Sequence, residues 1–118
     1  MKGGRLGEFE ELTLLAVCAI YAANDDVYGV PVQQFVEQTT GRDVTMGAVY
    51  SALDRLEDKG YVRSILGEAE QKRGGKRKRL FEATPAGLKV VKELRRVRER
   101  IWLHIELTRQ NAAAEKKA

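Results

Sequence analysis

The sequence predicts a single domain that is mainly α-helical and carries one small β-hairpin. Three observations support this fold class. The chain has 118 residues, which is the usual length of one domain. Four segments have the composition, the end signals or the apolar spacing of helices, and two shorter β-type segments flank a tract that contains Gly74-Gly75, a turn signal. The fractions of apolar residues, 43%, and of charged residues, 32%, are ordinary for a globular protein.

The first two helices are predicted over residues 8–23 and 31–40. The first segment lacks glycine and proline and is apolar on most sides, so we expect a helix that is buried on several faces. It contains the only cysteine, Cys18, which we expect to be a buried free thiol in a reducing compartment. Asp25 and Asp26 mark the end of this helix, and Pro31 at the first helical position begins the second, which ends near Gly41.

The third helix is predicted to begin after Thr45, a favourable N-cap, and to end before Gly60. Its apolar residues are spaced so that one face is directed toward a core, and these are Met46, Val49, Leu53 and Leu56. The opposite face is small and polar, and it consists of Gly47, Ser51, Asp54, Arg55 and Asp58, with Ala48 at its edge.

A hairpin is predicted next, with strands over residues 61–66 and 78–84 and a connecting tract over residues 67–77. Six basic residues and no acidic residue lie between Lys72 and Arg79, so the whole positive excess of the chain, a net charge of +4, is located there.

The last helix is predicted from Pro85, with Thr84 as its N-cap, to about Leu107, and we expect residues 111–118 to fray. Its apolar stripe has the spacing of a coiled-coil seam and is longer than the small preceding body can cover. A second copy of the chain would cover it, so we predict a homodimer whose interface includes Val90, Leu94, Val97, Ile101 and Ile105. The chain is thus divided into a body over residues 1–84 and a dimerisation helix with its tail over residues 85–118.

The order of three helices, a hairpin and a helix is that of a winged helix-turn-helix domain, in which the third helix enters the major groove of DNA. Small groups at the start of that helix let its backbone approach DNA closely, and the hydroxyls there can bond phosphates or bases. Clustered cations favour binding to the dense line of phosphates in the DNA backbone. The acidic Asp54 and Asp58 would repel phosphates, so we expect the N-terminal half of the third helix to be the part that contacts bases. The candidate DNA contacts are Thr45, Gly47, Ala48, Tyr50, Ser51, Arg55, Lys72, Arg73, Lys76, Arg77 and Lys78.

Other classes of function find little support in the residues. One cysteine and one histidine on separate helices indicate neither a metal site nor a catalytic pair, so we expect no enzyme, no cofactor and no metal. No apolar run is long enough to cross a membrane and no secretory signal begins the chain, which favours a cytoplasmic protein. The alternative is a winged-helix protein-interaction module whose hairpin binds an acidic partner without specific DNA binding.

Three segments resemble one family. The run from Gly47 to Val62 (GAVYSALDRLEDKGYV) is similar to the pattern G-x-φ-Y-x-x-L-x-R-L-E-x-x-G-φ-φ, and residues 77–87 (RKRLFEATPAG) to R-x-x-Y-x-L-T-x-x-G. Residues 27–30 (VYGV) resemble the aromatic-glycine start of the second helix. The pattern is that of the PadR-like transcriptional regulators. The resemblance implies a dimeric repressor that binds a palindromic operator in double-stranded DNA and is released by a small molecule or another signal. Trp102 resembles the tryptophans with which some short members bind flat aromatic ligands. The alternative interpretation of Trp102 is a core or interface residue.

Overall fold

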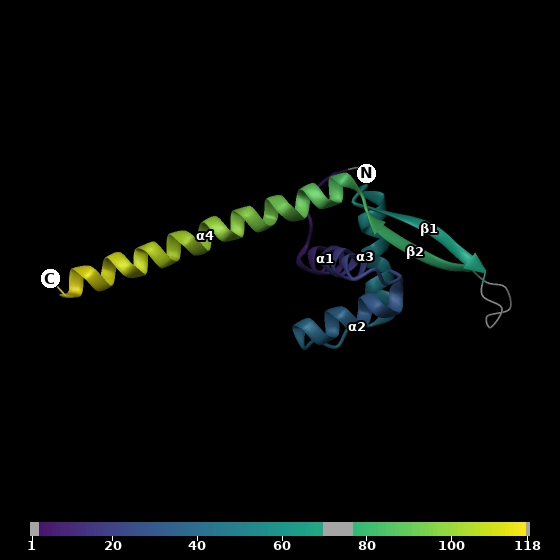
Figure 1. Ribbon diagram of the computed structural model, residues 1–118, viewed down its shortest axis with the longest axis horizontal. Coiled ribbons are helices and arrows are strands. Elements are labelled where there is room, and N and C mark those ends of the chain that lie inside the picture. The colour runs from purple at the N-terminus through teal and green to yellow at the C-terminus, as the bar shows by residue number, and fades with distance from the viewer. Residues whose placement is uncertain (1–2, 70–76, 118) are drawn as a thin grey trace. The chain divides into compact units, whose positions relative to one another are not determined.

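The computed structural model describes residues 3–69 and 77–117. The elements follow one another as α1 (Glu8–Ala22), α2 (Gly29–Thr40), α3 (Met46–Asp58), β1 (Val62–Ala69), β2 (Arg77–Ala83) and α4 (Pro85–Lys117). Figure 1 shows this order, with β1 and β2 forming one antiparallel hairpin. The predicted fold class, mainly α-helical with a small hairpin, is therefore confirmed.

The core lies where α1, α2 and α3 pack against one another and against the base of the hairpin. The predicted inner face of α3 is confirmed at Val49, Leu53 and Leu56, which have no solvent-exposed surface, whereas Met46 at the start of the helix is only half-buried. The core residues contributed by the other elements are Leu14, Ala16, Val17, Ile20, Val27, Val32, Val36, Val44, Tyr61, Val62 and Phe81.

Local signals determine where α2 and α3 begin and end. Gly41 and Gly60 have φ of 72° and 81°, in the left-handed region that glycine adopts without strain, and each follows the end of a helix as predicted. The N-cap of α3 is Thr45, whose Oγ1 accepts a hydrogen bond from the Ala48 amide at 3.1 Å. Helix α2 begins at Gly29, slightly earlier than the predicted start at Pro31.

The hairpin is longer than the sequence predicts, because β1 continues past Leu66 to Ala69. Val62 is paired with Ala83, and the pairing is regular from there to Leu66, which is paired with Arg79. An irregularity follows between Leu66 and Ala69. The Phe81 amide donates to the Val27 carbonyl at 2.9 Å, so β2 is also attached to the segment that precedes α2.

The start of α4 is fixed to the turn that follows α3. The Thr84 hydroxyl donates to the Gly60 carbonyl at 2.6 Å and accepts from the Gly87 amide at 3.1 Å, and the Thr84 amide donates to the Tyr61 carbonyl at 3.0 Å. Thr84 therefore serves as an N-cap and also as a link between two parts of the fold.

Helix α4 has 33 residues, which is about 50 Å at 1.5 Å per residue. It continues past the predicted end at Leu107 to Lys117, so the expected fraying of residues 111–117 is not found. By contacts the chain forms two compact units, Met1–Leu88 and Lys89–Ala118, and the boundary between them lies inside α4.

Candidate nucleic-acid interface

The outer face of α3 is the exposed surface opposite its core contacts, and it is the surface that the sequence predicts. Its members are Gly47, Ser51, Asp54, Arg55 and Asp58, all of which are exposed, and the N-cap Thr45, which adjoins this face, is exposed as well. The N-terminal half of this face presents a glycine backbone and two hydroxyls, and the C-terminal half presents two carboxylates and a guanidinium. Ala48, at the edge of this face, is half-buried.

Tyr50 lies at the flank of the outer face, beside the start of α2. Its ring occupies the space that a side chain on Gly29 would need, because a Cβ on Gly29 would lie 2.6 Å from the Tyr50 Oη and 2.7 Å from the Met46 Cε. The tyrosine nevertheless remains 38% exposed. The hydroxyl end of Tyr50 thus packs against the start of α2, while part of the residue remains exposed beside the outer face of α3.

Arg55 lies on the side of α3 that adjoins α1. Its Nε is 3.8 Å from the Glu10 Oε2, which also accepts a hydrogen bond from Lys59 Nζ at 2.7 Å. Glu10 further accepts from the Gly7 amide at 2.8 Å. Burial alone would raise the pKa of Glu10, but the hydrogen bonds from Lys59 and Gly7 and the nearby positive charges outweigh burial and lower it. Glu10 therefore stays ionised and positions Arg55 at the edge of the outer face.

The hairpin adjoins the opposite side of α3 through a network of ions. Arg79, on β2, contacts Asp54 and Glu57, and Glu57 in turn accepts hydrogen bonds from the backbone and the hydroxyl of Ser64, on β1. These hydrogen bonds from Ser64, together with Arg79, hold the pKa of Glu57 below its usual value. This network is not predicted by the sequence, because the pairing of Arg79 with α3 depends on tertiary contacts.

The predicted basic contacts of the hairpin are placed only in part. Lys72, Arg73 and Lys76 lie outside the described residues, and for Arg77 only the backbone, in β2, is described. Lys78 Nζ lies over the ring of Tyr28, 4.6 Å from its centroid, and Lys78 lines a surface pocket together with Asp25 and Asp26, which precede α2. The structure thus places Lys78 against the connection between α1 and α2 rather than against α3.

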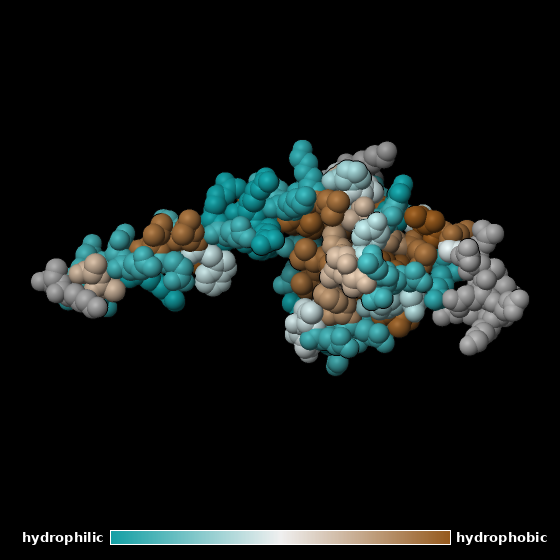
Figure 2. Space-filling model, viewed as in Figure 1, coloured by the Kyte–Doolittle hydropathy of each residue, from teal (hydrophilic) through white to brown (hydrophobic). Residues whose placement is uncertain are grey.

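Helix α4 presents the predicted apolar stripe. None of its five members, Val90, Leu94, Val97, Ile101 and Ile105, is buried, and Ile101 is 55% exposed. Figure 2 shows hydrophobic groups interrupting the hydrophilic surface of this helix. Trp102 is 62% exposed.

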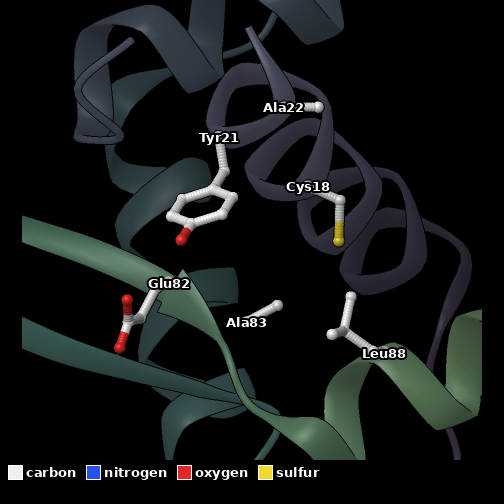
Figure 3. A pocket seen from close by; sticks show the side chains of 6 residues that line it. All are labelled: Cys18, Tyr21, Ala22, Glu82, Ala83 and Leu88. Atoms are coloured by element: carbon white, nitrogen blue, oxygen red, sulfur yellow. The ribbon is translucent and has the colours of Figure 1, made fainter. Parts of the chain in front are cut away.

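A cavity of about 400 Å³ lies beside α1 in the unit Met1–Leu88. In Figure 3 the Cys18 sulfur points toward Leu88, while Tyr21 approaches from the side of Glu82. Cys18 is only half-buried, contrary to the expected buried thiol, and burial raises its pKa, so it is a poor nucleophile. The sequence contained one signal of this site, namely that α1 is apolar on more sides than the core can cover. The lining residues are Cys18, Tyr21, Ala22, Glu82, Ala83 and Leu88.

Within residues 3–69 and 77–117, no three His, Cys, Asp or Glu side chains come together as metal ligands. None of the helices in the described part of the chain is both long and apolar enough to cross a membrane.

Comparison with solved structures shows a shared fold. A transcriptional regulator from Clostridium thermocellum is 24% identical, with a TM-score of 0.60, and the match covers 83% of this chain and 86% of that one. A PadR-like transcriptional regulator from Bacillus cereus is 16% identical, with a TM-score of 0.63 over 82% and 86% of the two chains. A PadR family transcription regulator from Clostridium difficile is 20% identical, with a TM-score of 0.60 over 85% and 92%.

Among curated proteins, none matches the sequence. The model of the transcriptional regulator PadR-like family matches residues 18–93, which include α2, α3, both strands and the start of α4. This match covers more than half of the chain, and it includes the motifs on which the resemblance was based. The chain therefore belongs to the PadR-like family of transcriptional regulators, which are not enzymes.

Proposed function

We propose that this regulator binds double-stranded DNA through the outer face of α3, acts as a homodimer on a palindromic operator, and represses transcription until a small molecule or another signal releases it. Membership of a family of transcriptional regulators supports a nucleic-acid partner. The observation that carries the proposal is the glycine in the first turn of α3.

Gly47 is exposed, and the fold provides no reason for a glycine there. A Cβ at this position would meet nothing closer than the Thr45 Oγ1, at 4.0 Å, and Gly47 is not among the glycines with positive φ. Inside a helix, glycine is up to about 1 kcal/mol less favourable than alanine. A missing side chain does, however, let the helix backbone approach another molecule closely, as it must in a major groove.

The test replaces Gly47 by alanine and by leucine and measures binding to a duplex from upstream of the gene and to a scrambled duplex. We expect both variants to be at least as stable as wild type, and Gly47→Leu to bind DNA at least about tenfold more weakly, a loss of about 1.4 kcal/mol. Gln38→Leu, which places the same leucine side chain at an exposed position of α2, is the control. A stable Gly47→Leu variant with wild-type affinity contradicts the proposed interface.

Dimerisation places two copies of α3 on one face of the duplex. Half-sites about 34 Å apart, one helical turn, suit two symmetry-related helices and require a palindromic operator. The unburied stripe of α4 supports a second copy as the partner, because apolar side chains gain free energy when a partner removes them from water.

Two places suit a small-molecule signal, namely the α1 cavity and the surface around Trp102. The amphipathic, anionic dye 1-anilinonaphthalene-8-sulfonate, whose aromatic rings bind apolar surfaces, distinguishes between them, since Leu88→Glu changes only the first and Trp102→Leu only the second. We expect the Trp102→Leu variant to lose dye binding, because a planar ligand stacks on an exposed aromatic ring. Loss in Leu88→Glu alone would assign the ligand to the cavity instead.

A further inference from the structure

Two carboxylates lie one turn apart on the flank of α3 that adjoins the hairpin. The side chain of Asp54 is 58% exposed and that of Glu57 is 35% exposed. Like charges three residues apart on a helix repel each other. Asp54 also belongs to the outer face of α3, which the proposed function directs toward DNA. An unpaired carboxylate there would oppose binding to any phosphate backbone.

Arg79 supplies a cation to both carboxylates. Its Nη2 lies 3.1 Å from the Asp54 Oδ1 and 3.0 Å from the Glu57 Oε1, so a single guanidinium bridges the pair. Arginine is always ionised, and its planar group can serve two acceptors at once. The positive charge is therefore present at every pH at which the carboxylates are charged.

The position of Arg79 is fixed from the hairpin side as well. Its guanidinium carbon lies 4.8 Å from the centroid of the Phe81 ring, which is on the same face of β2 because it is two residues further along the strand. Phe81 is only 3% exposed, and its amide is bonded to the Val27 carbonyl. The guanidinium of Arg79 thus packs against the ring of a buried aromatic residue.

Glu57 completes the attachment, because it accepts from the Ser64 amide at 2.8 Å and from the Ser64 hydroxyl at 2.5 Å. It therefore joins α3 to β1, while Arg79 joins α3 to β2. Because Ser64 already holds the Glu57 carboxylate, the positive charge of Arg79 also serves the more exposed Asp54.

We propose that Arg79 is a positioning residue for DNA binding that neutralises Asp54 on the outer face of α3 and thereby removes a repulsion between that face and phosphate. The inference rests on the proposed function, since it assumes that this face meets DNA. It also explains how an acidic residue is compatible with that face.

The experiment is a double-mutant cycle on Arg79→Ala, Asp54→Asn and the double variant. Binding is measured to a random-sequence 30-base-pair duplex at about 50 mM salt, because repulsion by a carboxylate does not depend on sequence. We expect Arg79→Ala to weaken binding about fivefold, which corresponds to about 1 kcal/mol for a charge near 4 Å in water. The double variant should recover to within about twofold of wild type, because the carboxylate that opposed binding is gone.

Each other role of Arg79 gives a different result, and each would overturn the proposal. If Arg79 only braces the hairpin, the double variant stays as weak as Arg79→Ala. If Arg79 contacts a phosphate directly, Asp54→Asn gives no rescue and the slope of log affinity against log salt changes by about 1. If Asp54 accepts a hydrogen bond from a base amino group, Asp54→Asn alone weakens binding to the duplex from upstream of the gene more than binding to the random-sequence duplex.

Arg63 provides the matched control, because it belongs to the same hairpin and is paired with Glu82, on the opposite strand. Arg63→Ala removes the same charge, and adding Glu82→Gln should produce no rescue. Thermal unfolding and circular dichroism verify that every variant is folded. Failure of wild type to bind any duplex would contradict the proposed function itself, whereas binding by wild type without rescue by Asp54→Asn contradicts only the role of Arg79.

Discussion

Gly87 lies directly against the backbone carbonyl of Tyr61. A Cβ on Gly87 would be 2.1 Å from that oxygen and 3.0 Å from its carbon, which is far inside van der Waals contact. The neighbouring atoms belong to the backbone, so they cannot rotate away as a side chain would. The glycine of the T-x-x-G motif is therefore required by the close approach of α4 to the turn after α3.

We expect Gly87→Ala to destabilise the fold by at least about 2 to 3 kcal/mol, since the backbone of one element has to move. Thermal unfolding measures the change, which should lower Tm by several degrees per kcal/mol. Gly47→Ala is the matched control, because the same methyl group enters open space there. Equal Tm changes in the two variants would contradict the packing described for Gly87.

Thr84→Val removes the hydroxyl that caps α4 and bonds Gly60 while keeping the shape of the side chain. The expected loss is about 1 to 2 kcal/mol, the usual effect of removing an N-cap together with a buried hydrogen bond. Chemical denaturation provides the measurement. Thr84→Ser keeps the hydroxyl and should retain most of the stability. A Thr84→Val variant that is as stable as wild type, with a loss only in Thr84→Ser, would show that the methyl group, not the hydroxyl, matters.

The lowered pKa values of Glu10 and Glu57 predict the direction of acid sensitivity. Each carboxyl has an ordinary value of 4.5 and a lower value when folded, so the unfolded state binds more protons below about pH 5. Their contribution to stability is complete above the unfolded value and is lost as the pH falls through the folded value. Urea denaturation between about pH 3 and 7 should show this decline, and Glu10→Gln combined with Glu57→Gln should make it shallower.

The dimer prediction is tested on α4 itself. Ile101→Glu places a charge in the apolar stripe and should convert the dimer to monomer, because the charge would have to be buried without a partner. Sedimentation measures the molecular mass. Leu103→Glu is the control, since Leu103 is equally apolar and 59% exposed but lies on the other side of the helix. Dissociation of Leu103→Glu, with Ile101→Glu still dimeric, would assign the interface to the opposite face.

The helices and the outer face of α3 were predictable because their signals are local. Thr45, Gly41 and Gly60 mark helix ends by capping chemistry, and the spacing of Val49 and Leu53 identifies the buried face. The length of β1 was not predictable, since pairing past Leu66 depends on an irregular register.

The ion network on the hairpin flank of α3 was equally unpredictable from the sequence. Arg79 belongs to a run of basic residues in which nothing distinguishes it from Lys78. Folding directs Arg79 to the carboxylates of α3 and Lys78 to the ring of Tyr28. Alternation along a strand predicts that two neighbours face apart, but only tertiary packing determines what each one meets.

The anchorage of α4 has a consequence for how such a regulator can be altered. Its partners on the other side are the main-chain carbonyls of Gly60 and Tyr61, which are present whatever side chains those residues carry. This attachment of α4 requires a particular side chain at Thr84 and the absence of one at Gly87. Beyond Leu88 the helix belongs to a separate compact unit. Replacing the helix after Leu88 by a different assembly or sensing helix would therefore leave the unit that carries α3 and the hairpin intact.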